Sequence, residues 1–184
     1  MYYSLVHFPN IDKNQINNFR KKYDPYINLI DAHITIIFPV PGSVTKDQLI
    51  NHINKILQNW KSFDIHIKDT EKAWDHWMFL LLEKGNTEIN KLHDELYSGM
   101  LKPFLRKDIK YIPHIAIGLF IKEVAVYDLK DPQKTNFDKN TYEDALKEVK
   151  QLNFDYNSTV NKLSLVEIND DFTKSILIKE FQLN

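Results

Sequence analysis

The feature that most constrains the fold of this chain is a short pattern that occurs twice. His33-Ile34-Thr35-Ile36 and His114-Ile115-Ala116-Ile117 each begin an apolar, β-branched run with a histidine, and they lie 114 − 33 = 81 residues apart. Such runs favour β-strands, in which successive side chains face opposite ways. Each histidine then shares a face with the second residue after it, while the isoleucines point into a core. We predict two strands that bring two imidazoles together in one groove.

The segments around the two patterns follow each other in the same order. Apolar periodicity predicts strands over residues 2–8, 33–38, 63–69, 77–82, 114–120, 160–168 and 174–182. Two helices are predicted to begin with a capping box, formed by Asp12 with Gln15 and by Thr45 with Gln48. Thr141 is predicted to cap another helix, and helical spacing predicts a further helix over 87–100. The order strand, helix, histidine strand, helix, strand occurs up to residue 69 and again from residue 77. We therefore predict an α+β fold, with residues 1–184 forming one domain of two pseudo-symmetric lobes.

Composition limits the class of protein. With 184 residues, 43% hydrophobic residues, 4 glycines and 7 prolines, the chain is long and apolar enough to fold around a sizeable core. A net charge of −1 does not favour long nucleic acids or a membrane surface, and the absence of cysteine excludes disulfides and thiolate metal sites. The N-terminal residues lack a signal-peptide pattern, and no apolar run has membrane-spanning length. We predict a cytoplasmic monomer.

The flanks of the two patterns make the sequence similar to a known family. The first copy lies in residues 32–39 (AHITIIFP), the second in residues 111–118 (YIPHIAIG), and residues 163–166 and 180–183 form two closing strands. This arrangement resembles the two-histidine (2H) phosphoesterase superfamily, which includes bacterial 2′-5′ RNA ligases and cyclic nucleotide phosphodiesterases. The resemblance implies a duplicated bilobal fold, with two antiparallel sheets facing across a central groove and helices outside. Ala116 departs from the family pattern, which has Thr or Ser there.

The resemblance also implies roles for the residues of the two patterns. His33 and His114 would act as general acid and base on a cyclic phosphate, a role suited to imidazole because its pKa is near neutrality. Thr35 would hold a non-bridging phosphate oxygen, while Ala116 offers only its backbone or its position. Losing a hydrogen bond to a charged group costs about 1.5–3 kcal/mol, and in a transition state the rate penalty is about a hundredfold. Which histidine is the acid, and whether the reaction is hydrolysis or ligation, stay open.

Together these features predict a metal-independent phosphoesterase with no cofactor and no protein partner. Its substrate would be an RNA end that carries a 2′,3′-cyclic phosphate, or a small cyclic nucleotide. An alternative is a protein of the same fold that only binds a nucleotide or RNA end, because Ala116 weakens catalysis. A third possibility is an α+β interaction protein whose histidines are structural.

Further residues are candidates for the same site. Tyr111 and Lys110, with the neighbouring basic residues Lys102, Arg106 and Lys107, would form a cationic wall for phosphate or a solvated surface. Other candidates are aromatic: the cluster Trp74, His76 and Trp77 would stack a base or pack in the core.

The remaining aromatic and histidine residues are predicted to lie outside the site. The alternation that buries Ile34 and Ile36 places Phe38 in the core. His93 is expected on a polar helix face, His66 on a polar strand face, and His7 in packing, and no histidine spacing matches a metal-ligand pattern.

Overall fold

A computed structural model of the chain describes residues 1–72, 76–123 and 136–184. Their secondary structure is β1 (Tyr2–His7), α1 (Asn14–Tyr23), β2 (Ile34–Pro41), α2 (Lys46–Leu57), β3 (Phe63–Lys72), β4 (Trp77–Lys84), α3 (Asn86–Leu96), the 3₁₀ helix η1 (Gly99–Phe104), β5 (His114–Leu119), α4 (Lys139–Val149), β6 (Asp155–Val160), β7 (Lys162–Ile168) and β8 (Ser175–Gln182). The fold is α+β, as predicted. That residues 1–184 form a single domain stays a prediction.

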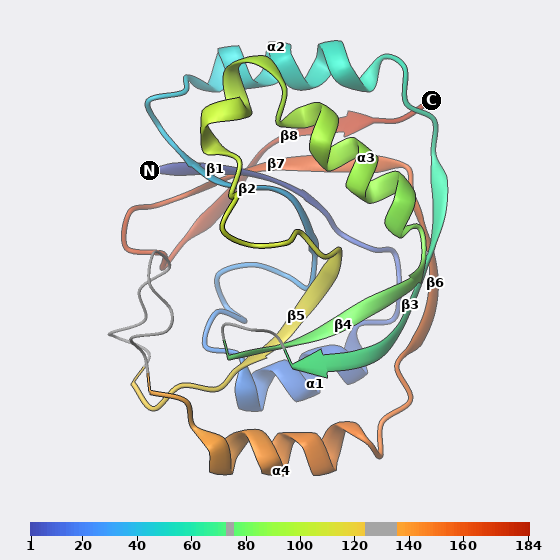
Figure 1. Cartoon of the computed structure of the whole chain (residues 1–184), viewed down its shortest axis with the longest axis vertical. Coiled ribbons are helices and arrows are strands. Elements are labelled where there is room, and N and C mark those ends of the chain that lie inside the picture. The colour runs from blue at the N-terminus through green and yellow to red at the C-terminus, as the bar shows by residue number, and fades with distance from the viewer. Residues whose placement is uncertain (73–75, 124–135) are drawn as a thin grey trace.

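The strands form one antiparallel sheet in the order β6-β3-β4-β5-β2-β1-β7-β8. The two histidine strands, β2 and β5, are neighbours at its centre, where Ile34 pairs with Ile115. On one side of this pair lie β4, β3 and β6, and on the other β1, β7 and β8, so the two sheets that were predicted are the two halves of one continuous sheet. In Figure 1, α2 and α3 lie at one end of the molecule, and α1 and α4 lie at the other. The predicted duplication is visible in the sheet, because β1 lies beside β2 as β4 lies beside β5.

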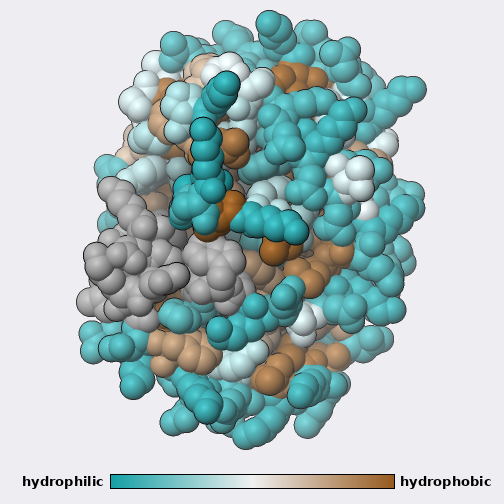
Figure 2. Space-filling view, in the orientation of Figure 1, coloured by the Kyte–Doolittle hydropathy of each residue, from teal (hydrophilic) through white to brown (hydrophobic). Residues whose placement is uncertain are grey.

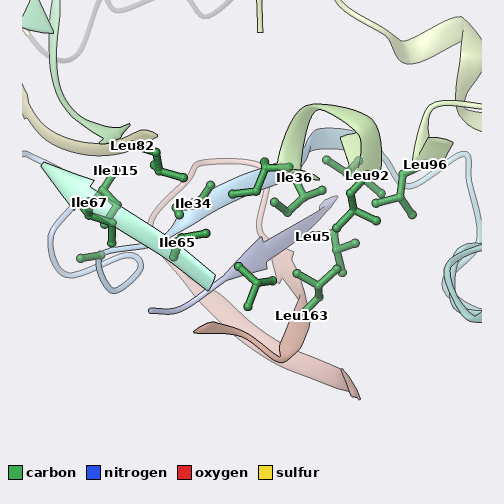
Figure 3. Packing of buried hydrophobic residues seen from close by; sticks show 14 of the residues in the cluster. Leu5, Ile34, Ile36, Ile65, Ile67, Leu82, Leu92, Leu96, Ile115 and Leu163 are labelled. Carbon is green, nitrogen blue, oxygen red and sulfur yellow. The ribbon is translucent and has the colours of Figure 1, made fainter. Parts of the chain in front are cut away.

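The core lies on the isoleucine face of the histidine strands. Ile34, Ile36, Ile115 and Ile117 are all inaccessible to solvent. They belong to one cluster with the apolar sides of all four α-helices, so the helices cover this face of the sheet. Figure 3 shows Ile34 and Ile36 among side chains from the neighbouring strands and from α3. Burying each such side chain stabilises the fold by about 1.5–3 kcal/mol, which fixes the opposite face as the one that carries the histidines.

The sequence misses strand β6. Its alternate residues Asp155, Asn157 and Thr159 are exposed, and only Val160 is fully buried. The strand pairs with β3 at the edge of the sheet, from Phe63↔Val160 to Lys68↔Asp155. An edge strand with a polar outer face carries too little apolar periodicity to be recognised from sequence.

The predicted start of α1 is wrong in detail. The N-cap is Lys13, which makes no side-chain cap, and the Asp12 carboxylate accepts a hydrogen bond from the Asn14 N–H at 3.0 Å. The expected capping box fails because the Gln15 side chain instead accepts a hydrogen bond from the Tyr156 hydroxyl at 3.2 Å. A long-range contact with β6 thus replaces the local one.

Two other helix starts give a contrast. The capping box of α2 forms as predicted, with Thr45 accepting from the Gln48 N–H and the Gln48 side chain accepting from the Thr45 N–H. At α4 the cap is Asp138, which accepts from the Thr141 N–H at 3.2 Å, so the prediction that Thr141 caps this helix is wrong. Asp138 is a strong N-cap because it accepts as a carboxylate at the positive end of the helix.

The end of β2 also differs from the prediction. The strand continues through Pro39 to Pro41, and Val40 pairs with Tyr3. Register shifts along β1 break the strict alternation of β2, so Phe38 is half-buried and lies outside the core. The ring of Phe38 meets Tyr111 edge-on, with centroids 6.0 Å apart. A β-bulge changes which face the later side chains occupy, and sequence alternation alone cannot show it.

The face shown in Figure 2 is mostly hydrophilic, with apolar atoms in separate patches. Within residues 1–72, 76–123 and 136–184, no helix combines the length and apolar character needed to span a membrane.

Candidate functional site

The antiparallel register brings the two sequence patterns together. Because Ile34 pairs with Ile115, His33 lies opposite Ala116 and Thr35 lies opposite His114. Paired residues point to the same face, so all four side chains lie on the face opposite the buried isoleucines. All four are half-buried, which leaves part of each open to solvent. The two histidines are therefore diagonal neighbours across the central strand pair.

Each histidine ring is held in the same way. The Nδ1 atom of His33 lies 2.7 Å from the Asp31 carbonyl oxygen, and the Nδ1 atom of His114 lies 2.6 Å from the Ile112 carbonyl oxygen. A carbonyl only accepts hydrogen bonds, so Nδ1 carries the proton in both rings. In the neutral form each ring then presents the lone pair of Nε2. The local geometry of the site is duplicated along with the sequence.

Both rings are held in the neutral form. Burial lowers the pKa of His33 to about 4, and the positive charges of Arg20 and Lys13 add to this effect. Burial also lowers the pKa of His114 to about 4, and the charge of a protonated His33 contributes. The two rings are thus coupled electrostatically. An anion bound beside them would have the opposite effect, because a negative charge favours the protonated ring.

Two phenylalanines complete the site, and the sequence did not identify either. The ring of Phe79, on β4, stacks on His114 with centroids 3.5 Å apart and planes inclined by 18°. Phe79 pairs with Ala116 in the sheet register, which places it on the histidine face. The ring of Phe8 meets His33 edge-on at 6.1 Å. The alternation of β4 could have placed Phe79 on that face, but not beside His114.

Tyr111 supports the backbone of the first pattern. Its hydroxyl donates a hydrogen bond to the Thr35 carbonyl at 2.7 Å, and burial raises its pKa. The ring stacks on His93 with centroids 3.7 Å apart and planes inclined by 4°. His93 is buried, not exposed on a polar helix face as predicted, and its Nδ1 lies 2.8 Å from the Ile36 carbonyl. The structure thus gives Tyr111 a supporting contact, and a direct contact with phosphate stays a prediction.

The basic residues before the second pattern are on the surface. Lys110, Lys102 and Lys107 are exposed. Arg106 pairs with Asp108, with Nε 2.8 Å from a carboxylate oxygen. Phosphate binding by Lys110 therefore stays a prediction, and for its neighbours the alternative of a solvated surface is the simpler interpretation.

The aromatic cluster divides between described and undescribed residues. Trp74 lies outside the described residues. His76 stacks on Phe137 with centroids 5.1 Å apart, and Trp77 stacks on Tyr26 at 6.1 Å. Both contacts are with other parts of the same chain, as the packing alternative expects.

The remaining histidines also have structural partners. His7 is buried, with Nδ1 3.0 Å from the Lys162 carbonyl. His66 lies between two carboxylates, 2.6 Å from Glu83 and 2.7 Å from Asp155. The hydrogen bonds that the His66 ring donates to Asp155 and Glu83 raise its pKa. Among the residues described, no group of three or more His, Cys, Asp or Glu side chains is arranged to hold a metal ion.

Residues 8–172 match the family model of the 2′-5′ RNA ligase superfamily, and the chain belongs to this superfamily. A Bacillus licheniformis protein described as a "putative phosphoesterase" is 27% identical over 123 residues, covering 64% of this chain and 70% of the relative. A similarly described Bacillus cereus protein is 25% identical over 122 residues, covering 64% of this chain and 69% of the relative.

Solved structures show the same fold. Escherichia coli LigT in its apo form superposes with a TM-score of 0.59 at 15% identity, covering 99% of this chain and 95% of LigT. TT0787 of Thermus thermophilus superposes with a TM-score of 0.60 at 13% identity, covering 100% of this chain and 98% of that protein. The predicted 2H phosphoesterase fold is therefore confirmed.

Proposed function

We propose that this chain is a metal-independent phosphoesterase in which His33 and His114 act as general acid and base on a cyclic phosphate. The observation that carries the proposal is the register of β2 and β5, which puts both half-buried rings on the same face of the sheet. The matched hydrogen bonds of the two Nδ1 atoms add to it, because they leave Nε2 of each ring for proton transfer. Membership of the superfamily supports the same class of chemistry.

The reaction follows from one neutral and one protonated ring. Nε2 of the neutral ring takes a proton from water as the water oxygen attacks phosphorus. The bond from phosphorus to one ribose oxygen breaks, and the protonated ring donates its Nε2 proton to that leaving oxygen. The product is a phosphomonoester beside a free hydroxyl. Thr35 donates its hydroxyl to a non-bridging oxygen, and the second copy of the pattern lacks this donor at Ala116, which lowers the rate.

The protonated ring depends on the substrate. With pKa values of about 4, both imidazoles are almost entirely neutral at pH 7 in the free protein. A phosphodiester is an anion at that pH, and its charge beside the rings raises their pKa. Substrate binding thus increases the fraction of protein in which one ring is protonated and can act as the general acid. Either ring can hold the added proton, so the assignment of acid and base stays open.

A nucleotide is the substrate class that the comparisons support. LigT of Escherichia coli has been solved in complexes with 3′-AMP, with phosphate, with ATP and with NADP⁺. By analogy in fold, we propose a 2′,3′-cyclic phosphate on an RNA end or on a small nucleotide. Cytoplasmic localisation and a monomeric state stay predictions from sequence.

The decisive experiment measures hydrolysis of 2′,3′-cyclic AMP in the presence of EDTA. The wild type should turn over, and His33→Ala and His114→Ala should each lose activity by a factor of about 10²–10⁴, the usual contribution of a general acid or base. His52→Ala is the matched control, because His52 is half-buried and its Nε2 lies 2.8 Å from the Leu96 carbonyl. Equal rates in all four proteins would remove the proposal.

Ala116 favours a second candidate function, a protein that binds a nucleotide without turning it over. Ala116 lies opposite His33, where a hydroxyl would be close to the phosphate. Ala116→Thr restores the family residue in a strand, where threonine is well tolerated. If the variant gains turnover from a wild type that has none, the natural chain is a binding protein. If the wild type is already active and the variant is faster, the enzymatic function stands.

A further inference from the structure

A cavity of about 350 Å³ lies beside His33, and the catalytic proposal does not use it. Its walls include residues 27–31, the Phe8 ring, and side chains from β7 and β8. Asp31 also lines it, and the carbonyl of Asp31 is the group that holds the His33 ring. The volume falls within the range of small-molecule sites. Phe8, which also lines the cavity, meets the His33 ring edge-on, with centroids 6.1 Å apart.

The sheet register places the cavity on the histidine face. Thr35 pairs with Val6 on β1, and Val6 pairs with Ser164 on β7. Paired side chains share a face, so Ser164, which lines the cavity, lies on the same face as Thr35, two strands away. The cavity and the two imidazoles therefore lie on the same face of the sheet, separated by the buried Val6, against which Phe8, Leu29 and Ile30 pack.

The wall formed by residues 27–31 is fixed from two sides. The buried Arg20 guanidinium donates to the Asp24 carboxylate at 2.7 Å and to the Ile30 carbonyl at 2.9 Å. From the other side, the Ser175 hydroxyl on β8 donates to the Leu29 carbonyl. A wall held in this way is preorganised, so little conformational entropy is lost when a ligand binds.

The lining combines six apolar residues with six polar or charged residues. Leu29, Val166 and Leu177 contribute aliphatic surface, and Phe8 contributes an aromatic ring. The hydroxyl of Ser164 adds a group that both donates and accepts hydrogen bonds. Flat heteroaromatic groups with polar edges suit such a surface, because their faces contact the aliphatic side chains and their edges meet the polar atoms.

The charges of the lining disfavour a second phosphate. Asp31 and Glu180 both contribute carboxylates to the cavity. The Lys13 ammonium, which also lines it, lies 3.5 Å from Asp31, and the Lys162 ammonium lies 2.6 Å from Glu180. Each of these cations is already paired with a carboxylate. An additional phosphate would meet two carboxylates here, whereas an uncharged base would not be repelled.

We propose that this cavity binds the nucleobase and ribose of the substrate, so that the protein acts on a nucleoside cyclic phosphate whose base lies on the His33 side. The same cavity selects against substrates that would place a further phosphate there. This inference rests on the proposed function, which places the reacting phosphate at His33 and His114.

Methyl and imidazole NMR of the full chain tests the placement of the two parts of a nucleotide. We expect inorganic phosphate to shift the ring signals of His33 and His114 and to leave the methyl signals of Leu29, Val166 and Leu177 unchanged. We expect 3′-AMP to shift both sets. If 3′-AMP shifts the ring signals but not these methyl signals, the cavity proposal is overturned and the proposed function stays intact. Shifts of the methyls alone would support the cavity and overturn the function, and a lack of both would overturn both.

A matched pair of variants on β8 tests the same proposal by kinetics. Leu177 and Ile176 are adjacent exposed residues, at 57% and 43% exposure, but only Leu177 lines the cavity. We expect Leu177→Glu to lower kcat/KM for 2′,3′-cyclic AMP about tenfold or more, because it removes apolar contact and adds a third carboxylate. The same variant should leave kcat/KM for base-free glycerol 1,2-cyclic phosphate unchanged, and Ile176→Glu should leave both values unchanged. Equal effects of the two variants, or equal effects on the two substrates, would overturn the proposal.

Discussion

The depressed pKa values of the two histidines make the proposed activity strongly dependent on pH. A ring with a pKa of about 4 is protonated in about 0.1% of molecules at pH 7, compared with about 24% for an ordinary histidine with a pKa of 6.5. The population of free protein that carries a proton on one ring is therefore reduced about 200-fold at pH 7. The value of kcat/KM reports this free population.

We expect kcat/KM for 2′,3′-cyclic AMP to rise about tenfold for each unit that the pH falls from 8 to 5, because the reaction needs one protonated and one neutral ring. The increase should level off near pH 4, where the coupled pair titrates. The assay is initial-rate hydrolysis across this range with EDTA present, and circular dichroism at each pH confirms that the chain stays folded.

An NMR titration of the two rings provides the control. His33→Asn should raise the pKa of His114, because the positive charge of protonated His33 helps to lower it. His66 is an internal reference in the same spectra, since its carboxylate partners raise its pKa. A kcat/KM value that stays constant between pH 5 and 7, or ring pKa values near 6.5, would refute the conclusion that burial sets the protonation of this site.

Three further outcomes follow from the same contacts. Thr35→Val should lower kcat about a hundredfold, because it removes the hydroxyl that we propose as a donor to the phosphate, whereas Thr35→Ser should stay close to wild type in the same assay. Tyr111→Phe loses the hydrogen bond to the Thr35 carbonyl, and urea unfolding should show a loss of about 1 kcal/mol in the free energy of unfolding. Because the pKa of His66 is raised in the folded protein, its ion pairs with Glu83 and Asp155 stabilise the fold at low pH. This stabilisation is lost as the pH rises through the pKa of His66 in the folded protein. His66→Gln should therefore lower Tm at pH 5.5 and leave Tm unchanged at pH 9, and equal losses at both values would contradict this.

The sequence by itself determined the parts of this protein that depend on neighbouring residues. The alternation in residues 33–36 and 114–117 indicates which side chains are buried, and the structure buries those isoleucines. The capping box that Thr45 and Gln48 form likewise involves only four consecutive residues. Side-chain periodicity and helix capping can be predicted from short segments, because they depend only on the local backbone geometry of each segment.

Only the tertiary structure decided how these segments meet. The pairing of Ile34 with Ile115 places His33 opposite Ala116, and no local pattern fixes that register. The stacking of Phe79 on His114 and the cavity beside residues 27–31 likewise join segments that are distant in the chain. Such contacts are set by how the helices and strands pack around one core, so their energies depend on the whole fold and not on any single stretch of sequence.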